Sequence, residues 1–128
     1  MIELKNLTIE KAGMKLESGE ISALQLTQYY LKNIKEKNTK LNAYLEVFQD
    51  AEEQAKKIDE GIKSGKDMGP LAGIPFAIKD NILINGKSAS ASSKILENYK
   101  ATYDATVIEK LREAGAVFLG RVNMDEFA

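Results

Sequence analysis

The sequence predicts an α/β protein in which a helical segment comes first and alternating strands and helices follow. An apolar, β-branched run from Ile74 to Ile84 predicts a buried strand that continues into a loop. Asp104 is expected to cap a helix formed by the apolar positions that follow it, and this helix stops at Gly115. Ala116 to Gly120 predicts a second short strand. A strand, a loop, a helix and a strand in this order form a crossover unit of parallel or mixed sheets.

The amino-terminal half of the chain has helical periodicity. A short helix is expected from Thr8 to Leu16, with Gly19 ending it. Ser22 and Gln25 have the Ser-x-x-Gln spacing of a capping box, and the apolar positions that follow predict a helix over about 22–37.

A short extended stretch and one more helix complete this half. The residues from Leu41 to Val47 alternate between apolar and more polar types, as in a strand. Asp50 and Glu53 form a second capping-box pattern, which opens a helix that Gly65 ends. The polar segment from Ser64 to Gly69 is the clearest boundary. We therefore expect a helical segment over 1–66 and the first part of an α/β core over 67–128, together one incomplete domain.

The composition excludes several kinds of site within the chain. There is no Cys and no His, so a thiolate nucleophile, a Cys- or His-ligated metal and a Ser-His-Asp triad are all excluded. Any general base must then be Lys, Asp, Glu or Tyr. The net charge of -1, with basic and acidic residues interspersed, creates no field that would attract a polyanion. No apolar run approaches the roughly 18 residues of a membrane span, and we expect a cytoplasmic protein.

Lys79 is the leading candidate for a catalytic residue. In the predicted strand, one face carries the large apolar residues Ile74, Phe76 and Ile78, and the other carries Pro75, Ala77 and Lys79. A lysine that ends an apolar strand beside Asp80 and Asn81 is expected to be partly buried, and a buried lysine can serve as a general base. On these residues alone, the favoured interpretation is an ordinary strand-end lysine whose ammonium reaches solvent or pairs with Asp80.

Other polar motifs are weaker candidates. Ser88, Ser90, Ser92 and Ser93 form either a loop of hydroxyls beside an active site or a flexible polar loop. A phosphate-binding loop ending at Ser88 is rejected, because Asn81 stands where that motif requires glycine. The carboxylates of Asp125 and Glu126 point in opposite directions on an extended chain, which favours a capping or supporting role. Tyr29 and Tyr30 are expected to pack between core and surface.

The run from Gly69 to Asn81, which contains Gly-Ile-Pro-Phe-Ala-Ile-Lys-Asp-Asn, resembles the lysine motif of the amidase signature family. Ser93 to Tyr99, Tyr103 to Val107 and Gly120 to Ala128 follow in the order and spacing of that family. Within the family, the final segment is most similar to the glutaminase subunits of the glutamyl-tRNA(Gln) and aspartyl-tRNA(Asn) amidotransferases. The resemblance spans nearly the whole chain and implies an α/β/α fold with a large mixed sheet.

The resemblance also implies a Ser-cis-Ser-Lys triad in which Lys79 is the base. Lys79 would accept a proton from a bridging serine, which activates the nucleophilic serine that attacks glutamine. The chain would assemble with subunits B and C, and the ammonia released would pass to a partner subunit that uses ATP and magnesium to amidate mischarged tRNA. The resemblance implies no cofactor in this chain, and contact with tRNA only through the complex.

Two departures from the family pattern stand out. The chain reads Ala89 to Ser93 where relatives have a Thr-Thr-Cys-Ala-Ser-like run, and it has 128 residues where relatives have several hundred. We therefore expect an amino-terminal fragment that lacks both catalytic serines and has no amidase activity of its own. A free-standing amidase and a non-catalytic interaction module remain the alternatives.

Overall fold

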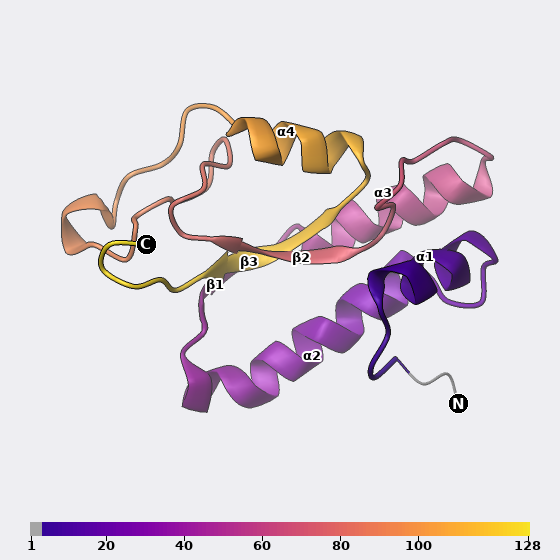
Figure 1. Ribbon diagram of the computed structural model, residues 1–128, viewed down its shortest axis with the longest axis horizontal. Coiled ribbons are helices and arrows are strands. Elements are labelled where there is room, and N and C mark those ends of the chain that lie inside the picture. The colour runs from indigo at the N-terminus through magenta and orange to yellow at the C-terminus, as the bar shows by residue number, and fades with distance from the viewer. Residues whose placement is uncertain (1–3) are drawn as a thin grey trace.

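The computed structural model describes residues 4–128 and shows an α/β arrangement of the kind expected (Figure 1). Residues 1–3, which belong to the predicted helical segment, lie outside the described part. In chain order the elements are α1 (Ile9–Glu17), α2 (Ala23–Leu41), β1 (Tyr44–Val47), α3 (Ala51–Lys63), β2 (Pro75–Lys79), the 3₁₀ helix η1 (Lys94–Leu96), α4 (Thr106–Glu113) and β3 (Val117–Val122).

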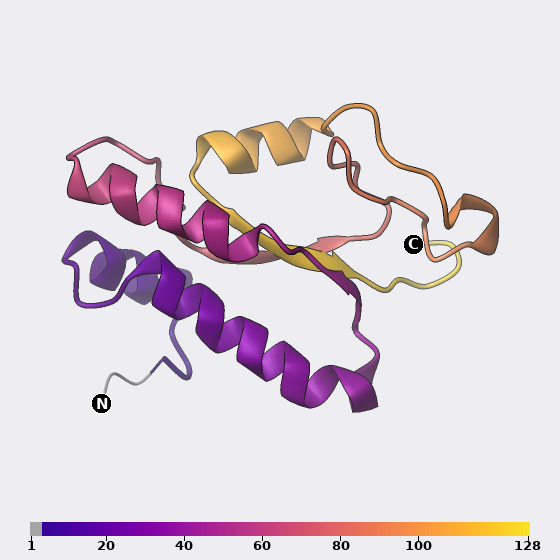
Figure 2. The ribbon, with the colours of Figure 1, turned by 180° about the vertical axis from the view of Figure 1, so that it is seen from behind.

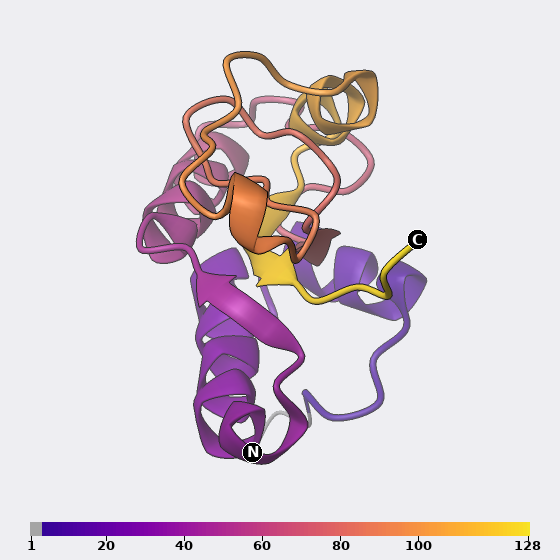
Figure 3. The ribbon, with the colours of Figure 1, turned by 90° about the vertical axis from the view of Figure 1, so that its left-hand side faces the viewer.

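A small mixed sheet is the centre of the molecule. Its strand order is β1-β3-β2, with β2 parallel and β1 antiparallel to β3. The connection from β2 through α4 to β3 is the crossover unit that the sequence predicts. α4 covers one face of the sheet, and α1 and α2 lie on the other side (Figures 1 and 3).

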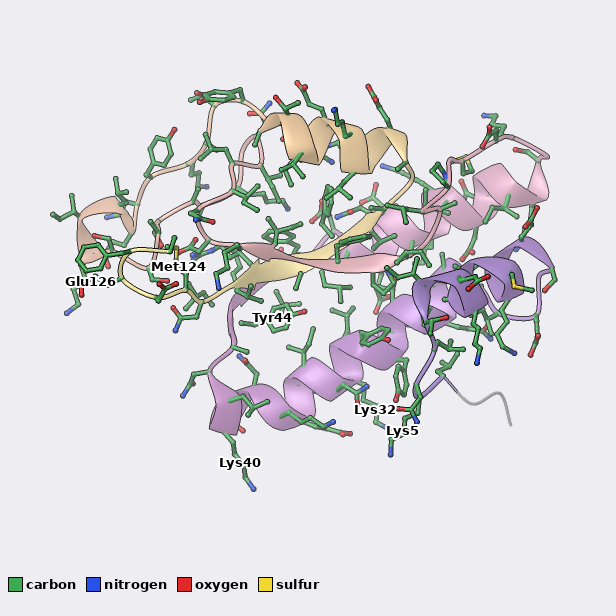
Figure 4. The ribbon with its side chains drawn as sticks, viewed as in Figure 1. Lys5, Lys32, Lys40, Tyr44, Met124 and Glu126 are labelled. Carbon is green, nitrogen blue, oxygen red and sulfur yellow. The ribbon has the colours of Figure 1, made fainter. Side chains whose placement is uncertain are left out.

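Residues from both predicted segments share this sheet, because β1 precedes the boundary at residue 66 and β3 follows it. α3 runs beside the sheet and beside α2 (Figure 2). The Tyr44 side chain lies between the sheet and α2 (Figure 4). The division of the chain at residue 66 stays a prediction.

The apolar core is divided by the sheet into two clusters. Val117 and Leu119 pack with Ile74 and with apolar residues of α1, α2 and α3. Phe118, between them in β3, packs instead with Ile78 and Ile108 on the α4 side. This alternation is what a strand covered on both faces requires.

Each of the two strand pairs has one irregularity in its register. Phe76 pairs with Phe118 but Ala77 pairs with Gly120, so Leu119 has no counterpart in β2. On the other side of β3, the pairing similarly skips Leu45 of β1. An extra residue in a strand reverses the side to which the following residues point. The bulge at Leu119 therefore places Arg121 on the same face as its partner Ile78.

The glycine-rich loop before β2 is fixed on the end of α4. The amides of Leu71 and Gly73 donate to the carbonyl oxygens of Ala114 and Gly115, at 2.8 and 2.9 Å. Gly115 has φ of +84°, and a Cβ there would overlap the carbonyl oxygen of Met68. The close approach of the two backbones requires glycine at this position, and it sets β2 beside β3.

Several predicted helix ends are confirmed. Ser22 and Gln25 form the reciprocal capping box at the start of α2, with both bonds at 3.0 Å. Gly65, at φ of +72°, follows α3, and its amide donates to the carbonyl oxygen of Ile62 at 3.0 Å. Asp59 of α3 adds a cap that the sequence did not reveal, because its carboxylate accepts from the amides at the start of α2 at 2.7 and 3.0 Å.

Two predicted caps are wrong. Asp50 makes no side-chain cap bond to α3, and its carboxylate binds Lys87 at 2.7 Å instead. Its backbone, with φ of -88° and ψ of 3°, is outside the extended region that a capping residue needs. Asp104 likewise does not cap α4, because its carboxylate accepts from the amide of Asn85 and from Arg112. In both cases a cation elsewhere in the fold engages the carboxylate.

None of the helices within residues 4–128 is long and apolar enough to cross a membrane.

Candidate functional site

Lys79 is the last residue of β2, as the sequence predicts. Ile78 is buried on the α4 side, and Ala77 and Lys79 are exposed, so the predicted alternation is confirmed for these three residues. It is wrong for Ile74, which precedes β2 and packs in the cluster on the opposite side of the sheet from Ile78. The expected burial of Lys79 is wrong within residues 4–128, where its side chain is exposed. Lys79 is exposed because it ends β2, which is an outer strand of the sheet. The apolar cluster on the side of α1 and α2 includes Ile74, just before the other end of β2, but does not extend to Lys79.

Asp80 follows Lys79 and points into the protein. The residue is 1% exposed, and its carboxylate accepts hydrogen bonds from the Ser90 amide (3.1 Å), the Ser90 hydroxyl (2.6 Å) and the Ser92 amide (2.7 Å). The Nη1 atom of Arg121 donates a fourth bond at 2.7 Å. Within the described part of the chain, Asp80 is therefore committed to these donors and forms no ion pair with Lys79.

Arg121 joins all three strands of the sheet. Its Nη1 binds Asp80 at the end of β2, and its Nε binds the carboxylate of Glu46 in β1 at 2.8 Å. This contact depends on the bulge at Leu119, since regular alternation would place Arg121 on the face of Lys79. The bulge thus places the guanidinium beside Asp80 and away from Lys79.

The hydrogen bonds determine the ionisation of this network. Burial acts to raise the pKa of Asp80, but the bonds from Ser90, Ser92 and Arg121 outweigh it and hold the pKa below its ordinary value. For Arg121, burial acts to lower the pKa, but the carboxylates of Glu46 and Asp80 raise it overall. Asp80 and Arg121 are therefore both charged at neutral pH.

The serine-rich loop predicted from the sequence contributes a turn at Asp80. Ala91 and Ser92 both have left-handed backbones, with φ of 48° and 53°, in a turn that we call the serine turn (Ser90 to Ser93). The Ala91 amide donates to the carbonyl oxygen of Asp80 at 3.1 Å, and the Ser92 hydroxyl donates to Asn123 Oδ1 at 2.7 Å. Ser88 lies apart from this turn, in a bridge with Lys100.

The remaining candidates lie elsewhere. Asp125 and Glu126 are exposed in the carboxyl-terminal segment (Figure 4 labels Glu126 there). Tyr29 and Tyr30 of α2 contact each other edge to face, with ring centroids 5.4 Å apart. Arg121 and Glu46 were not predicted as site residues, because their meeting depends on a strand register that the sequence does not specify.

Two cavities of the described residues lie away from Lys79. One, of about 740 Å³, lies between α1 and the end of α3, with Leu16, Ile62 and Met68 among its lining residues. Another, of about 430 Å³, lies on α2 beside Gln25 and Tyr29. Among residues 4–128, no three acidic side chains lie close enough together to hold a metal ion.

The structure thus places a strand-end lysine directly before Asp80, the centre of a buried Asp-Ser-Arg network. The model of the Amidase family matches residues 25–128. This chain belongs to the amidase family. The A subunit of glutamyl-tRNA(Gln) amidotransferase from Thermoanaerobacter pseudethanolicus is 48% identical over 128 residues, covering 99% of this chain and 26% of that protein. The corresponding protein from Endomicrobium trichonymphae is 44% identical over 129 residues, covering 100% of this chain and 27% of that protein.

Solved amidase structures confirm the predicted fold class. The native peptide amidase from Stenotrophomonas maltophilia is similar with a TM-score of 0.92 and 33% identity, covering 98% of this chain and 26% of that one. An amidase family protein from Bacillus anthracis has a TM-score of 0.89 and 34% identity, covering 98% of this chain and 26% of that one. The chain thus spans about a quarter of the length of the amidases that it matches.

Proposed function

We propose that this chain is the amino-terminal segment of the glutaminase subunit of a tRNA-dependent amidotransferase, and that Lys79 is its catalytic base. The observation that carries the proposal is the position of Lys79: it ends β2, and within residues 4–128 it has no carboxylate partner, because Asp80 is held by Ser90, Ser92 and Arg121. A base must be able to lose its proton, and a paired ammonium does so less readily. Identity of 41–48% to the A subunits of glutamyl-tRNA(Gln) amidotransferases supports the choice of reaction.

The proposed chemistry uses two serines from outside these residues. Neutral Lys79 accepts a proton from a bridging serine, which accepts one from the nucleophilic serine. The nucleophilic oxygen attacks the side-chain carboxamide carbon of glutamine. The C–N bond breaks as the amide nitrogen accepts the proton that the nucleophilic serine gave up, and the nitrogen leaves as ammonia. Water then hydrolyses the acyl-enzyme to glutamate. The 128-residue chain alone supplies the base without the nucleophile and is expected to be inactive.

The proposal places the chain in a cytoplasmic complex with subunits B and C. Ammonia passes to a partner in this complex that uses ATP and magnesium to convert Glu-tRNA(Gln) to Gln-tRNA(Gln), or Asp-tRNA(Asn) to Asn-tRNA(Asn). The near-neutral charge of this chain, with 18 basic and 19 acidic residues, agrees with tRNA being held by other parts of the complex.

A free-standing amidase is the second candidate. It is favoured by the similarity to the peptide amidase from Stenotrophomonas maltophilia, which has a TM-score of 0.92. The two candidates share Lys79 and differ in substrate. A non-catalytic interaction module is the third candidate, and it assigns Lys79 no chemical role.

The test begins with the codons that follow Ala128. We expect them to encode a glycine- and serine-rich segment with two serines suited to the triad; a stop codon at that point favours the module. The protein they encode should release ammonia from glutamine, and Lys79→Met should abolish this release while leaving the thermal unfolding midpoint close to that of wild type. Hydrolysis of small or aryl amides in preference to glutamine indicates the free-standing amidase. Undiminished activity of Lys79→Met contradicts the proposed role of Lys79.

A further inference from the structure

Each polar atom of Asp80 is engaged in a hydrogen bond. Its amide donates to the Val122 carbonyl oxygen of β3 at 3.1 Å, and its carbonyl oxygen accepts from Ala91 at 3.1 Å. One carboxylate oxygen accepts from the Ser90 amide and from Arg121, and the other accepts from the Ser90 hydroxyl and the Ser92 amide. One buried residue thus connects the ends of β2 and β3 to the serine turn.

These bonds also fix the backbone of Lys79. The peptide group between Lys79 and Asp80 consists of the Lys79 carbonyl and the Asp80 amide. The carbonyl oxygen accepts a hydrogen bond from the Ile82 amide at 3.0 Å, and the amide donates to the Val122 carbonyl oxygen at 3.1 Å. Both polar atoms of the peptide that joins Lys79 to Asp80 are therefore bonded. The backbone from which the lysine side chain extends is held on both sides of the strand end.

The serine turn is strained. Two consecutive residues with a Cβ, Ala91 and Ser92, have φ of 48° and 53°. A left-handed backbone is costly for such residues and persists where surrounding contacts enforce it. Here the enforcing contacts are three bonds from the turn to the carboxylate of Asp80 and one to its carbonyl oxygen. The strained turn is thus bonded to the residue that directly follows Lys79, which points to a geometric requirement at this strand end.

We propose that Asp80 is a positioning residue for the lysine base, acting by fixing the Lys79 backbone and holding the serine turn against it. The proposal rests on the proposed function of Lys79. Catalytic geometry must be kept to within about half an ångström, and a base displaced by about 1 Å loses rate without losing substrate affinity. An asparagine at position 80 would replace one of the two carboxylate oxygens by an NH2 group, which donates and cannot accept. Because Ser92 and Arg121 bind different oxygens, asparagine could accept a hydrogen bond from only one of them.

The test compares Asp80→Asn with Asp104→Asn in the full-length protein that contains this chain. Asp104 is a matched control, because it also binds an arginine (Arg112, 2.9 Å) and a backbone amide (Asn85, 2.7 Å), but it lies outside the network at Lys79. With glutamine as substrate, Asp80→Asn should lower kcat by about tenfold or more while KM changes less than about threefold. Asp104→Asn should keep the kcat of wild type.

A second variant tests the strain and does not depend on how well Asp80→Asn folds. Ala91→Gly relieves the left-handed backbone, so it should raise the thermal unfolding midpoint and, by loosening the turn, lower kcat by about threefold or more. Asn42→Gly is its control, since Asn42 has φ of 49° at the end of α2, outside the network at Lys79. This control should leave kcat unchanged.

A third readout needs no activity. In the 128-residue chain, hydrogen exchange at the amides of Asp80, Ile82 and Ala91 should accelerate in Asp80→Asn and not in Asp104→Asn.

Two results overturn the positioning role: a kcat for Asp80→Asn equal to that of Asp104→Asn, or a wild-type kcat for Ala91→Gly. If Lys79→Met is inactive while either result holds, the proposed function stands and the role of Asp80 does not. Activity in Lys79→Met refutes the proposed function itself, and the positioning role with it.

Discussion

The buried carboxylate of Asp80 makes the stability of the fold depend on pH. Its pKa in the folded protein is lower than its ordinary value, because the bonds from Ser90, Ser92 and Arg121 outweigh the opposing effect of burial. The unfolded chain therefore takes up a proton at higher pH than the folded chain does. It follows that the stabilisation is fully present above about pH 5 and is lost as the pH falls through the folded pKa.

We predict that Asp80→Asn lowers the free energy of unfolding by about 3 kcal/mol at pH 7, because it leaves Arg121 incompletely paired in a buried network. The difference from wild type should narrow as the pH falls from about 5 to 3. Urea unfolding at a series of pH values measures this. Asp50 and Asp104, whose pKa values are also lowered, are present in both proteins and cancel in the comparison. If the difference in the free energy of unfolding between wild type and Asp80→Asn does not change with pH, the pH-dependent stabilisation does not come from Asp80.

Thr27 shows the opposite situation, a polar group buried without compensation. Its side chain is fully buried in α2, and its hydroxyl has no hydrogen-bond partner among the described residues. Burial of an unpaired hydroxyl is unfavourable, and valine has nearly the same shape. Thr27→Val should therefore raise the free energy of unfolding by about 1 kcal/mol in urea titrations. Thr102→Val, at an exposed loop position, is the control; a loss of stability in Thr27→Val alone would show that the hydroxyl is satisfied.

Among the elements, the pairing of β1 with β3 depends on Gly120. A Cβ at Gly120 would overlap the backbone carbonyl oxygen of Glu46 and lie 3.0 Å from Val47 Cα, so the strands would have to separate. Gly120→Ala should lower the free energy of unfolding by about 2 kcal/mol or more.

Gly13 of α1 provides a matched comparison for Gly120. A Cβ at Gly13 would meet no heavy atom within 4 Å, and alanine favours the helix by about 0.5–1 kcal/mol. Gly13→Ala should therefore stabilise the protein while Gly120→Ala destabilises it, as chemical unfolding can measure. If both substitutions change the free energy of unfolding in the same direction, the close packing around Gly120 is contradicted.

The whole molecule exposes sheet edges and apolar side chains. β1 and β2 are the outer strands of the sheet, and Ile95 and Phe127 are 93% and 90% exposed. Unpaired strand edges and apolar surface favour association. We predict that the 128-residue chain self-associates with increasing concentration, as sedimentation velocity can measure. A monomer at every concentration, with a sharp two-state unfolding transition, contradicts this.

The sequence by itself determined the class of the fold, most of its elements and the leading candidate residue. Capping at Ser22, the glycines at 65 and 115 and the alternation around Ile78 are local features, and local backbone and side-chain preferences are enough to specify them. The absence of His and Cys restricted the possible chemistry in the same direct way.

The tertiary structure alone decided how charged groups meet. The sequence predicts Asp50 and Asp104 as helix caps, but their carboxylates bind Lys87 and Arg112 instead. Asp80 pairs with Arg121 and not with its sequence neighbour Lys79. The choice of partner depends on strand register and loop path. A single bulge at Leu119 reverses the face of Arg121, and no local pattern around Arg121 reveals that reversal.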